Sequence, residues 1–172
     1  MERYIQVYTG NGKGKTTAAL GLAVRALGNG YKVYIGQFMK GQIYGELRTF
    51  AKMDNIIIER FGTNNCIISR EHVEQLDREK AAKGLERAKE ALTCGHYQLV
   101  VLDEICVAHF FGLVTEEDIL ALMELKPKDV ELVLTGRYAP QAVMDRADLV
   151  TEMREIKHYY NKGVMARDGI ER

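Results

Sequence analysis

A glycine-rich loop near the start of the chain sets the strictest limit on its fold. Residues 9–17 read Thr-Gly-Asn-Gly-Lys-Gly-Lys-Thr-Thr, and they stand between a strand-like run, residues 4–8, and an Ala/Leu-rich helical run, residues 18–27. Glycines let successive backbone N–H groups turn inward around an anion, and the start of the following helix adds its positive end. The sequence therefore predicts a phosphate-binding loop that joins a strand to a helix.

The loop supplies the first candidate site residues. We expect Lys15 to extend from an exposed loop toward phosphate groups, and Thr16 to offer its hydroxyl to Mg²⁺. The usual motif, GxxxxGK followed by Ser or Thr, has its first glycine where this chain has Thr9. A turn without chemical function is the alternative, which the strand-to-helix context disfavours. The other loop residues expected around phosphates are Gly10, Asn11, Gly12, Lys13, Gly14 and Thr17.

Strand-length apolar runs alternate with helical patterns along the chain. Further strands are predicted at 32–38, 56–58, 98–102, 131–135 and 149–156, and further helices at 46–53, 70–92 and 115–124. This alternation is typical of an α/β fold, with a mostly parallel sheet and helices on both faces. The length of 172 residues suits one domain, so we expect residues 1–172 to form a single nucleotide-binding domain. The pattern assigns no fold to the segment from Lys157 onward.

Two acidic residues end the most continuous apolar run. Asp103 and Glu104 directly follow residues 98–102, which have the composition of a strand buried on both faces. In a parallel sheet the carboxyl ends of the strands face the ligand crevice, so these carboxylates could meet Mg²⁺ opposite Thr16. A polar strand end without a metal is the alternative. The spacing leaves open which carboxylate would touch the metal.

Two arginines and one Cys/His pair are weaker candidates. Arg137 follows the predicted strand 131–135, at the edge of the sheet where ligand-binding loops gather. Arg25 lies well inside the first predicted helix, where an exposed arginine without function is the simpler interpretation. Cys106 and His109 have the spacing i, i+3, but two ligands are too few for a zinc site, so a structural role is favoured.

Composition narrows the function classes further. The 24 Lys and Arg residues balance the 24 Asp and Glu residues, so the chain lacks the basic surplus of a general nucleic-acid or anionic-membrane binder. No apolar run approaches the roughly 18 residues of a membrane span, and no secretory signal precedes the first strand. Three cysteines without a CxxC pair argue against a disulfide framework. We therefore expect a cytoplasmic protein with no nucleic-acid or membrane partner.

Five segments, taken in order, resemble those of the ATP:corrinoid adenosyltransferases of the cobalamin pathway. They lie at 9–19, at 37–41 (Gln-Phe-Met-Lys-Gly), at 100–104 (Val-Val-Leu-Asp-Glu), at 134–137 (Leu-Thr-Gly-Arg) and at 148–155 (Asp-Leu-Val-Thr-Glu-Met-Arg-Glu). Thr at position 9 is usual in that family, and the segments span nearly the whole chain. The resemblance implies a RecA-like P-loop NTPase fold that is often a homodimer.

The resemblance also implies a reaction and its partners. Co(I) of a reduced corrinoid would attack C5′ of ATP and release triphosphate, in the biosynthesis or salvage of adenosylcobalamin. The cofactor would be Mg²⁺, and an electron-donating flavoprotein would be a further partner besides ATP and the corrinoid. By the same resemblance, Arg25 and Arg137 would help to hold the nucleotide.

The family's catalytic machinery maps onto the loop and the acidic pair. Residues 10–17, called the phosphate loop from here on, would cradle the triphosphate. Thr16 and Glu104 would hold Mg²⁺, with Asp103 behind them. Lys15 and Glu104 would be the catalytic residues, because positive charge from the lysine and the metal stabilises the leaving triphosphate.

One segment departs from the family pattern. Members that act on complete cobalamin carry Phe and Trp after the third strand, which crowd away the lower ligand of cobalt, whereas residues 64–67 here read Asn-Asn-Cys-Ile. Either Phe61, Phe110 or Phe111 takes over that role, or the substrate is an earlier corrinoid without a competing lower ligand. An ordinary P-loop ATPase or kinase, and a non-catalytic nucleotide-sensing module, are the alternative functions.

Overall fold

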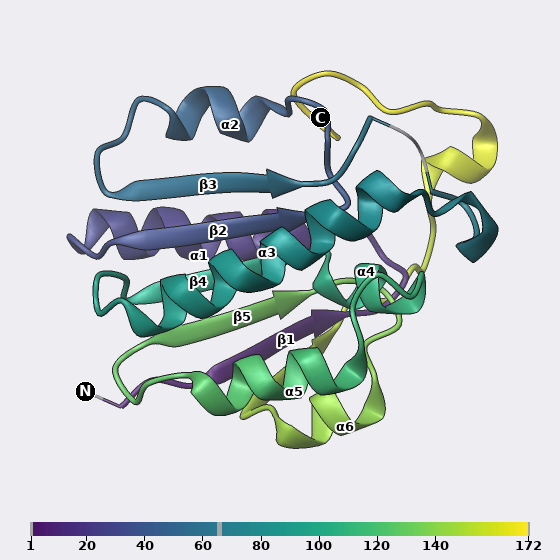
Figure 1. Ribbon diagram of the computed structural model, residues 1–172. Helices are drawn as coiled ribbons and strands as arrows, with labels where there is room; N and C mark the ends of the chain where they lie inside the picture. The colour runs from purple at the N-terminus through teal and green to yellow at the C-terminus, as the bar shows by residue number, and fades with distance from the viewer. Residues whose placement is uncertain (1, 65–66, 172) are drawn as a thin grey trace.

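The computed structural model describes residues 2–64 and 67–171. Within them, parallel strands form one sheet with the order β3-β2-β4-β5-β1-β6 (Figure 1). The strands are β1 (Ile5–Thr9), β2 (Val33–Phe38), β3 (Ile56–Phe61), β4 (Leu99–Asp103), β5 (Glu131–Thr135) and β6 (Leu149–Glu152). The predicted α/β class with a parallel sheet is confirmed.

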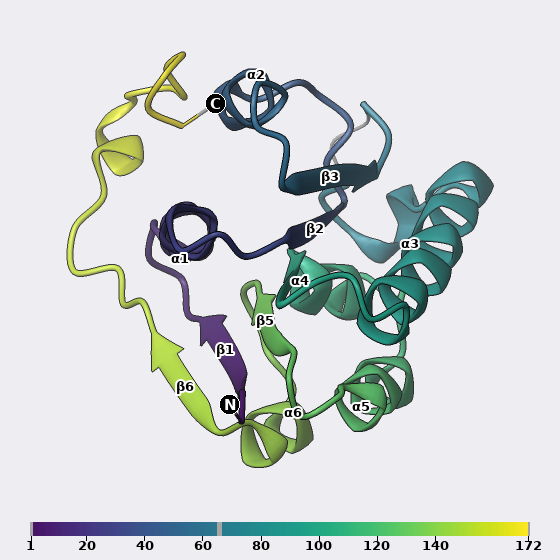
Figure 2. The ribbon, with the colours of Figure 1, turned by 90° about the vertical axis from the view of Figure 1, so that its left-hand side faces the viewer.

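Helices connect the strands and cover both faces of the sheet. Figure 2 shows α1 on one face and α3, α4 and α5 on the other. The helices are α1 (Lys15–Gly28), α2 (Gly45–Phe50), α3 (Gln75–Thr93), α4 (Ile105–Phe110), α5 (Glu116–Leu125) and α6 (Gln141–Arg146), with 3₁₀ turns at Arg70–His72 and Tyr159–Lys162. None of the helices in the described parts of the chain has the length and apolar character of a membrane-spanning helix.

Two apolar clusters hold the helices to the sheet. On one face, Ala19, Ala23 and Ala26 of α1 pack against Val101 and Val133 of the central strands. These alanines recur at helical spacing, and their small side chains let α1 lie close to the sheet. The larger cluster, on the opposite face, joins the sheet to α3, α4, α5 and α6. β4 is therefore buried on both faces, as its continuous apolar sequence predicted.

The start of α3 differs from the prediction. The helical pattern suggested a start at residue 70, but Glu74 is the N-cap and residues 70–72 form a separate 3₁₀ turn. Glu74 and Asp77 form a reciprocal capping box, in which the Glu74 backbone N–H donates to the Asp77 carboxylate at 3.0 Å. Thr63 also donates to the buried Asp77, at 2.7 Å. Apolar spacing alone could not locate this start, because the cap depends on polar contacts.

Gly84 and Gly21 form a matched pair for testing how closely the helices pack. A Cβ at Gly84 would lie 2.8 Å from Cε1 of Phe38 and 2.9 Å from Cγ of Phe61, whereas a Cβ at Gly21 would meet nothing within 4 Å. We expect Gly84→Ala to lower the free energy of unfolding by about 1–3 kcal/mol, because overpacking outweighs the gain in helix propensity. Gly21→Ala should raise it by about 0.5–1 kcal/mol. Urea denaturation checks both values, and equal effects at the two sites would contradict the close packing of α3.

Candidate functional site

The carboxyl ends of β1, β2, β4 and β5 meet the phosphate loop at one edge of the sheet. A cavity of about 630 Å³ opens there. Its walls include residues 11–17, Glu104 and Arg137, together with two segments that contain Lys40 and Glu171. The structure therefore brings most of the predicted site residues to one place.

Glycine is required in the phosphate loop for two reasons, a close backbone contact and a positive φ angle. A Cβ at Gly10 would lie 2.5 Å from the carbonyl oxygen of Met153, and one at Gly12 would lie 2.7 Å from the same atom. The Gly12 N–H donates to that oxygen at 2.6 Å. Gly14 has φ 121°, which favours glycine, and among the described residues no side chain caps the start of α1 behind it. An open helix start of this kind leaves backbone N–H groups that could bind an anion.

Lys15 is buried, which corrects the expectation of an exposed side chain. It is 6% exposed, and its Nζ donates to the carbonyl oxygens of Gly10 at 2.6 Å and Gly12 at 2.7 Å. The side chain thus folds back over its own loop instead of extending from it. Burial lowers the pKa of Lys15, and the nearby Glu104 carboxylate opposes that effect. A phosphate group in the cavity would compete with the two carbonyl oxygens for this ammonium.

Asp103 is the centre of a buried polar network. It is 1% exposed, and its carboxylate accepts hydrogen bonds from the Thr16 hydroxyl at 2.9 Å and the Thr135 hydroxyl at 2.7 Å. The Lys40 Nζ lies 2.6 Å from its other oxygen. Burial alone would lower the pKa of Lys40, but the contact with Asp103, together with the charges of Glu104 and Glu46, raises it.

Sequence reasoning assigned no role to Lys40 or Thr135. Both lie in segments that carry the family resemblance, and both stand at or just after the carboxyl end of a predicted strand. That position is the signal that could have found them, because parallel strands of one sheet end at the same edge. Without the strand order, however, no pattern in the sequence connects these side chains to Asp103.

Glu104 is held in a strained conformation beside the cavity. Its φ is 61°, and its backbone N–H donates to the Thr135 hydroxyl at 2.9 Å. Burial, followed by the charge of Asp103, raises the pKa of Glu104. Met39 and Tyr138 have φ values of 58° and 61°, just after β2 and β5. Such conformations cost roughly 1–3 kcal/mol each and cluster at functional sites, which supports a functional role for this edge.

Oxygen ligands for a divalent cation gather beside the phosphate loop. Thr16 and Glu104 line the cavity, and Asp103 binds the Thr16 hydroxyl from behind. Mg²⁺ usually takes one or two such protein oxygens and completes its shell with water and substrate phosphates. Residues 2–64 and 67–171 contain no group of three or more His, Cys, Asp or Glu side chains suited to a metal. The donor set therefore fits Mg²⁺ carried with phosphates and not a metal site made of protein ligands alone.

The two candidate arginines lie at different ends of the molecule. Arg137 lines the cavity beside the phosphate loop. Arg25 lies in the last turn of α1 and lines a separate cavity of about 570 Å³ with Arg3 and Glu131. The helix carries Arg25 about 15 Å along its axis from Lys15. A contact between Arg25 and a nucleotide at the phosphate loop stays a prediction of the resemblance.

The three aromatic residues that could replace the family's missing Phe and Trp differ in exposure. Phe61 is buried in the core, at 5% exposed, so little of its ring is open to a ligand in this arrangement, and its role stays a prediction. Phe110 is exposed and stacks on Tyr138 at 4.1 Å, with Phe111 edge-on to it at 5.2 Å. Residues 65–66, which carry part of the departure from the family pattern, lie outside the described residues.

Comparison with known proteins identifies one family. The family model described as ATP:corrinoid adenosyltransferase BtuR/CobO/CobP matches residues 1–172. The corrinoid adenosyltransferase of Pseudomonas aeruginosa is 35% identical over 167 residues, which cover 96% of this chain and 81% of that protein. That of Escherichia coli K12 is 31% identical over 167 residues, with 97% and 84% covered. An uncharacterized protein of Nostoc sp. is 35% identical over 167 residues, 90% of this chain, and the match spans 44% of its length.

The buried network gives a stability prediction. Asp103→Asn should lower the free energy of unfolding by about 3 kcal/mol, because the Lys40 ammonium would stay buried without a carboxylate. Lys40→Met should cost less, since Thr16 and Thr135 would still donate to Asp103. Urea denaturation of the two variants tests this difference. Equal stability of both would contradict the central position of Asp103 in the network.

Proposed function

The chain belongs to the ATP:corrinoid adenosyltransferase family, whose model matches residues 1–172, and we propose that it transfers the 5′-deoxyadenosyl group of ATP to Co(I) of a reduced corrinoid. Triphosphate is the second product. The observation that carries this proposal is the meeting of an uncapped helix start, Lys15 and Glu104 at one cavity. We further propose a role in the biosynthesis or salvage of adenosylcobalamin.

For this reaction the protein has to position the two reactants and stabilise the negative charge of the leaving triphosphate. An electron pair of Co(I) forms the new cobalt–carbon bond, while the bond between C5′ and oxygen breaks and its electron pair stays on the triphosphate. Negative charge therefore grows on the leaving group. The first turn of α1, whose backbone N–H groups have no partners within the helix, and the ammonium of Lys15 stabilise that charge. The nucleophile carries no proton, so the site needs no general base.

Thr16 and Glu104 are the residues that would hold Mg²⁺. When bound with the triphosphate, the ion adds positive charge at the oxygens of the leaving group. Asp103 keeps the Thr16 hydroxyl in place, and Lys40 pairs with the charge of Asp103. Of the pair Asp103 and Glu104, Glu104 is the residue that lines the cavity.

Product analysis separates this function from its alternatives. The protein is incubated with ATP, Mg²⁺ and a chemically reduced corrinoid, and the nucleotide and corrinoid products are identified. We expect triphosphate and adenosylated corrinoid in equal amounts. ADP would overturn the proposal in favour of phosphoryl transfer, and ATP left unchanged would overturn it in favour of nucleotide sensing.

Lys15→Met tests the phosphate loop directly. We expect adenosyl transfer to fall by about 100-fold or more, because the variant lacks a positive charge at the leaving triphosphate. The readout is the rate of triphosphate release under saturating ATP. Circular dichroism and thermal unfolding confirm that the variant is folded, since Lys15 also bonds the loop carbonyls. Full activity in a folded variant would contradict the role of the loop.

Glu104→Gln tests the metal assignment. The change keeps the volume of the side chain and removes its charge. The Mg²⁺ concentration that gives half-maximal rate should therefore rise by about tenfold, because the loss of one charged contact costs about 1.4 kcal/mol. A Mg²⁺ titration of the initial rate measures this shift, with corrinoid binding as the control that should change little. An unchanged Mg²⁺ requirement would remove Glu104 from the metal site.

The departure at residues 64–67 predicts a corrinoid preference. The family's aromatic side chains are absent at positions 65 and 67, and the polar Asn65 offers little apolar surface to cover a cobalt face, whose burial contributes about 25 cal/mol per Å². With Co(II) and a weak reductant, we expect a higher rate for a corrinoid that lacks the nucleotide loop than for complete cobalamin. Reduction to Co(I) beforehand should shrink the difference. Equal rates under weak reduction would instead implicate Phe61, Phe110 or Phe111 as the replacement for the missing aromatic side chains.

A further inference from the structure

The C-terminal segment, residues 153–171, runs back along the phosphate loop. Figure 2 shows this segment on the same side of the sheet as α1. At its start, the carbonyl oxygen of Met153 accepts the hydrogen bond from Gly12. Toward its end, residues 169–171 form part of the cavity wall, together with His158. The part of the chain from Lys157 onward, to which the sequence pattern assigned no fold, therefore contributes to the candidate site.

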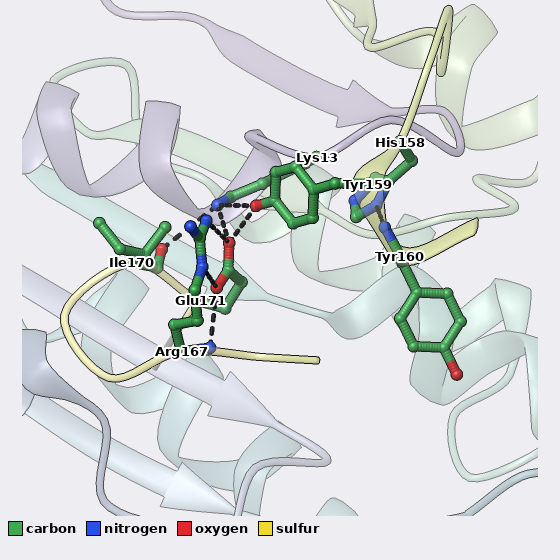
Figure 3. Close-up of polar contacts among 7 residues, drawn as sticks. All are labelled: Lys13, His158, Tyr159, Tyr160, Arg167, Ile170 and Glu171. Carbon is green, nitrogen blue, oxygen red and sulfur yellow. Dashed lines mark hydrogen bonds and ion pairs between the residues drawn. The ribbon is translucent and has the colours of Figure 1, made fainter. Parts of the chain in front are cut away.

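Lys13 of the phosphate loop is held by this segment. Its Nζ donates to the Glu171 carboxylate at 2.7 Å, to the Tyr159 hydroxyl at 3.0 Å and to the Ile170 carbonyl oxygen at 3.4 Å (Figure 3). An ammonium group has three hydrogens. These three acceptors use all of them, so Lys13 has no hydrogen left for a phosphate group in this arrangement.

Glu171 is itself fixed by its neighbours. The backbone N–H of Arg167 donates to its carboxylate at 2.9 Å, and the guanidinium of Arg167 donates to both carboxylate oxygens at 3.3 Å. The Tyr159 hydroxyl also donates to it. Its side chain is 17% exposed, against 51% for Arg167. These contacts lower the pKa of Glu171 and keep it charged.

A fixed carboxylate on this wall conflicts with the ligand that the cavity is proposed to hold. Triphosphate carries several negative charges, and like charges repel strongly where water is partly excluded. Glu171 and triphosphate would also compete for the same ammonium of Lys13. The two therefore cannot both occupy their best positions.

We propose that the C-terminal segment is a latch that ATP opens. Glu171 and Tyr159 hold Lys13 in the nucleotide-free protein, and the triphosphate takes over Lys13 and displaces Glu171 from the wall. The backbone contact between Gly12 and Met153 stays in place and keeps the start of the segment attached to the loop. This inference rests on the proposed function, since it requires ATP at the phosphate loop.

If the C-terminal segment is such a latch, Glu171 weakens the binding of nucleotide. Glu171→Gln should tighten the binding of ATP with Mg²⁺ by about two- to fivefold, the effect of one partly exposed ion pair, as measured by isothermal titration calorimetry. Glu155→Gln is the matched control on the same segment, because Glu155 is exposed and accepts a hydrogen bond from Asn161 at 3.0 Å. It should leave the affinity unchanged. Unchanged or weaker ATP binding in Glu171→Gln would overturn the latch.

A second pair of variants distinguishes the latch from simple removal of a negative charge. In a Lys13→Met background, Glu171→Gln should tighten ATP binding much less, because the contact that it releases is already gone and only the direct repulsion between Glu171 and triphosphate is relieved. The same tightening in that background would overturn the latch. In the unchanged protein, ATP should also speed hydrogen exchange at the Arg167 amide, which donates to Glu171. Slower exchange there would likewise overturn it.

The result separates the latch from the function on which it rests. If the unchanged protein and every variant fail to bind ATP, the proposed function fails and the latch fails with it. If all of them bind ATP with one affinity, the latch alone is wrong. Adenosyl transfer by Glu155→Gln provides the reference activity in the same preparations.

Discussion

A single buried carboxylate holds the candidate site together. Asp103 ends β4 and binds Thr16 at the start of α1, Thr135 at the end of β5 and Lys40 after β2. A charge that leaves water costs free energy unless its oxygens find partners. Because these three partners come from three separate parts of the chain, satisfying Asp103 also sets the position of the phosphate loop relative to the sheet. Glu104, the next residue, is then held at the cavity.

The phosphate loop is held by contacts on two sides, and these contacts differ in how far they are shielded from water. Behind it, the bond between Thr16 and Asp103 is largely shielded from water. In front of it, Lys13 contacts Glu171 where both side chains are partly exposed, at 38% and 17%. Exposed contacts open at lower free energy than buried ones, so the front of the loop is the part that a ligand can rearrange. This division lets the loop keep its shape while one wall of the cavity moves.

The linear sequence was sufficient for the strand and helix pattern, the phosphate loop and the acidic pair after β4. Each of these depends on neighbours within a few residues: the alternation of apolar runs, the glycine spacing, and a strand that ends in Asp103 and Glu104. The same local logic failed at the start of α3, where Glu74 and Asp77 form the cap, and at α4, which is shorter than two turns and follows a strained residue.

Which charged groups meet was decided by the strand order β3-β2-β4-β5-β1-β6 and by the return of the C-terminal segment. That order brings Lys40 into an ion pair with Asp103. The length of α1 separates Arg25 from the cavity at the phosphate loop. The returning segment brought Glu171 to Lys13 across most of the chain. No local pattern encodes these contacts, because they depend on the packing of elements that are distant in sequence. Local patterns identify groups capable of chemistry, and packing of the whole chain selects the ones that act together.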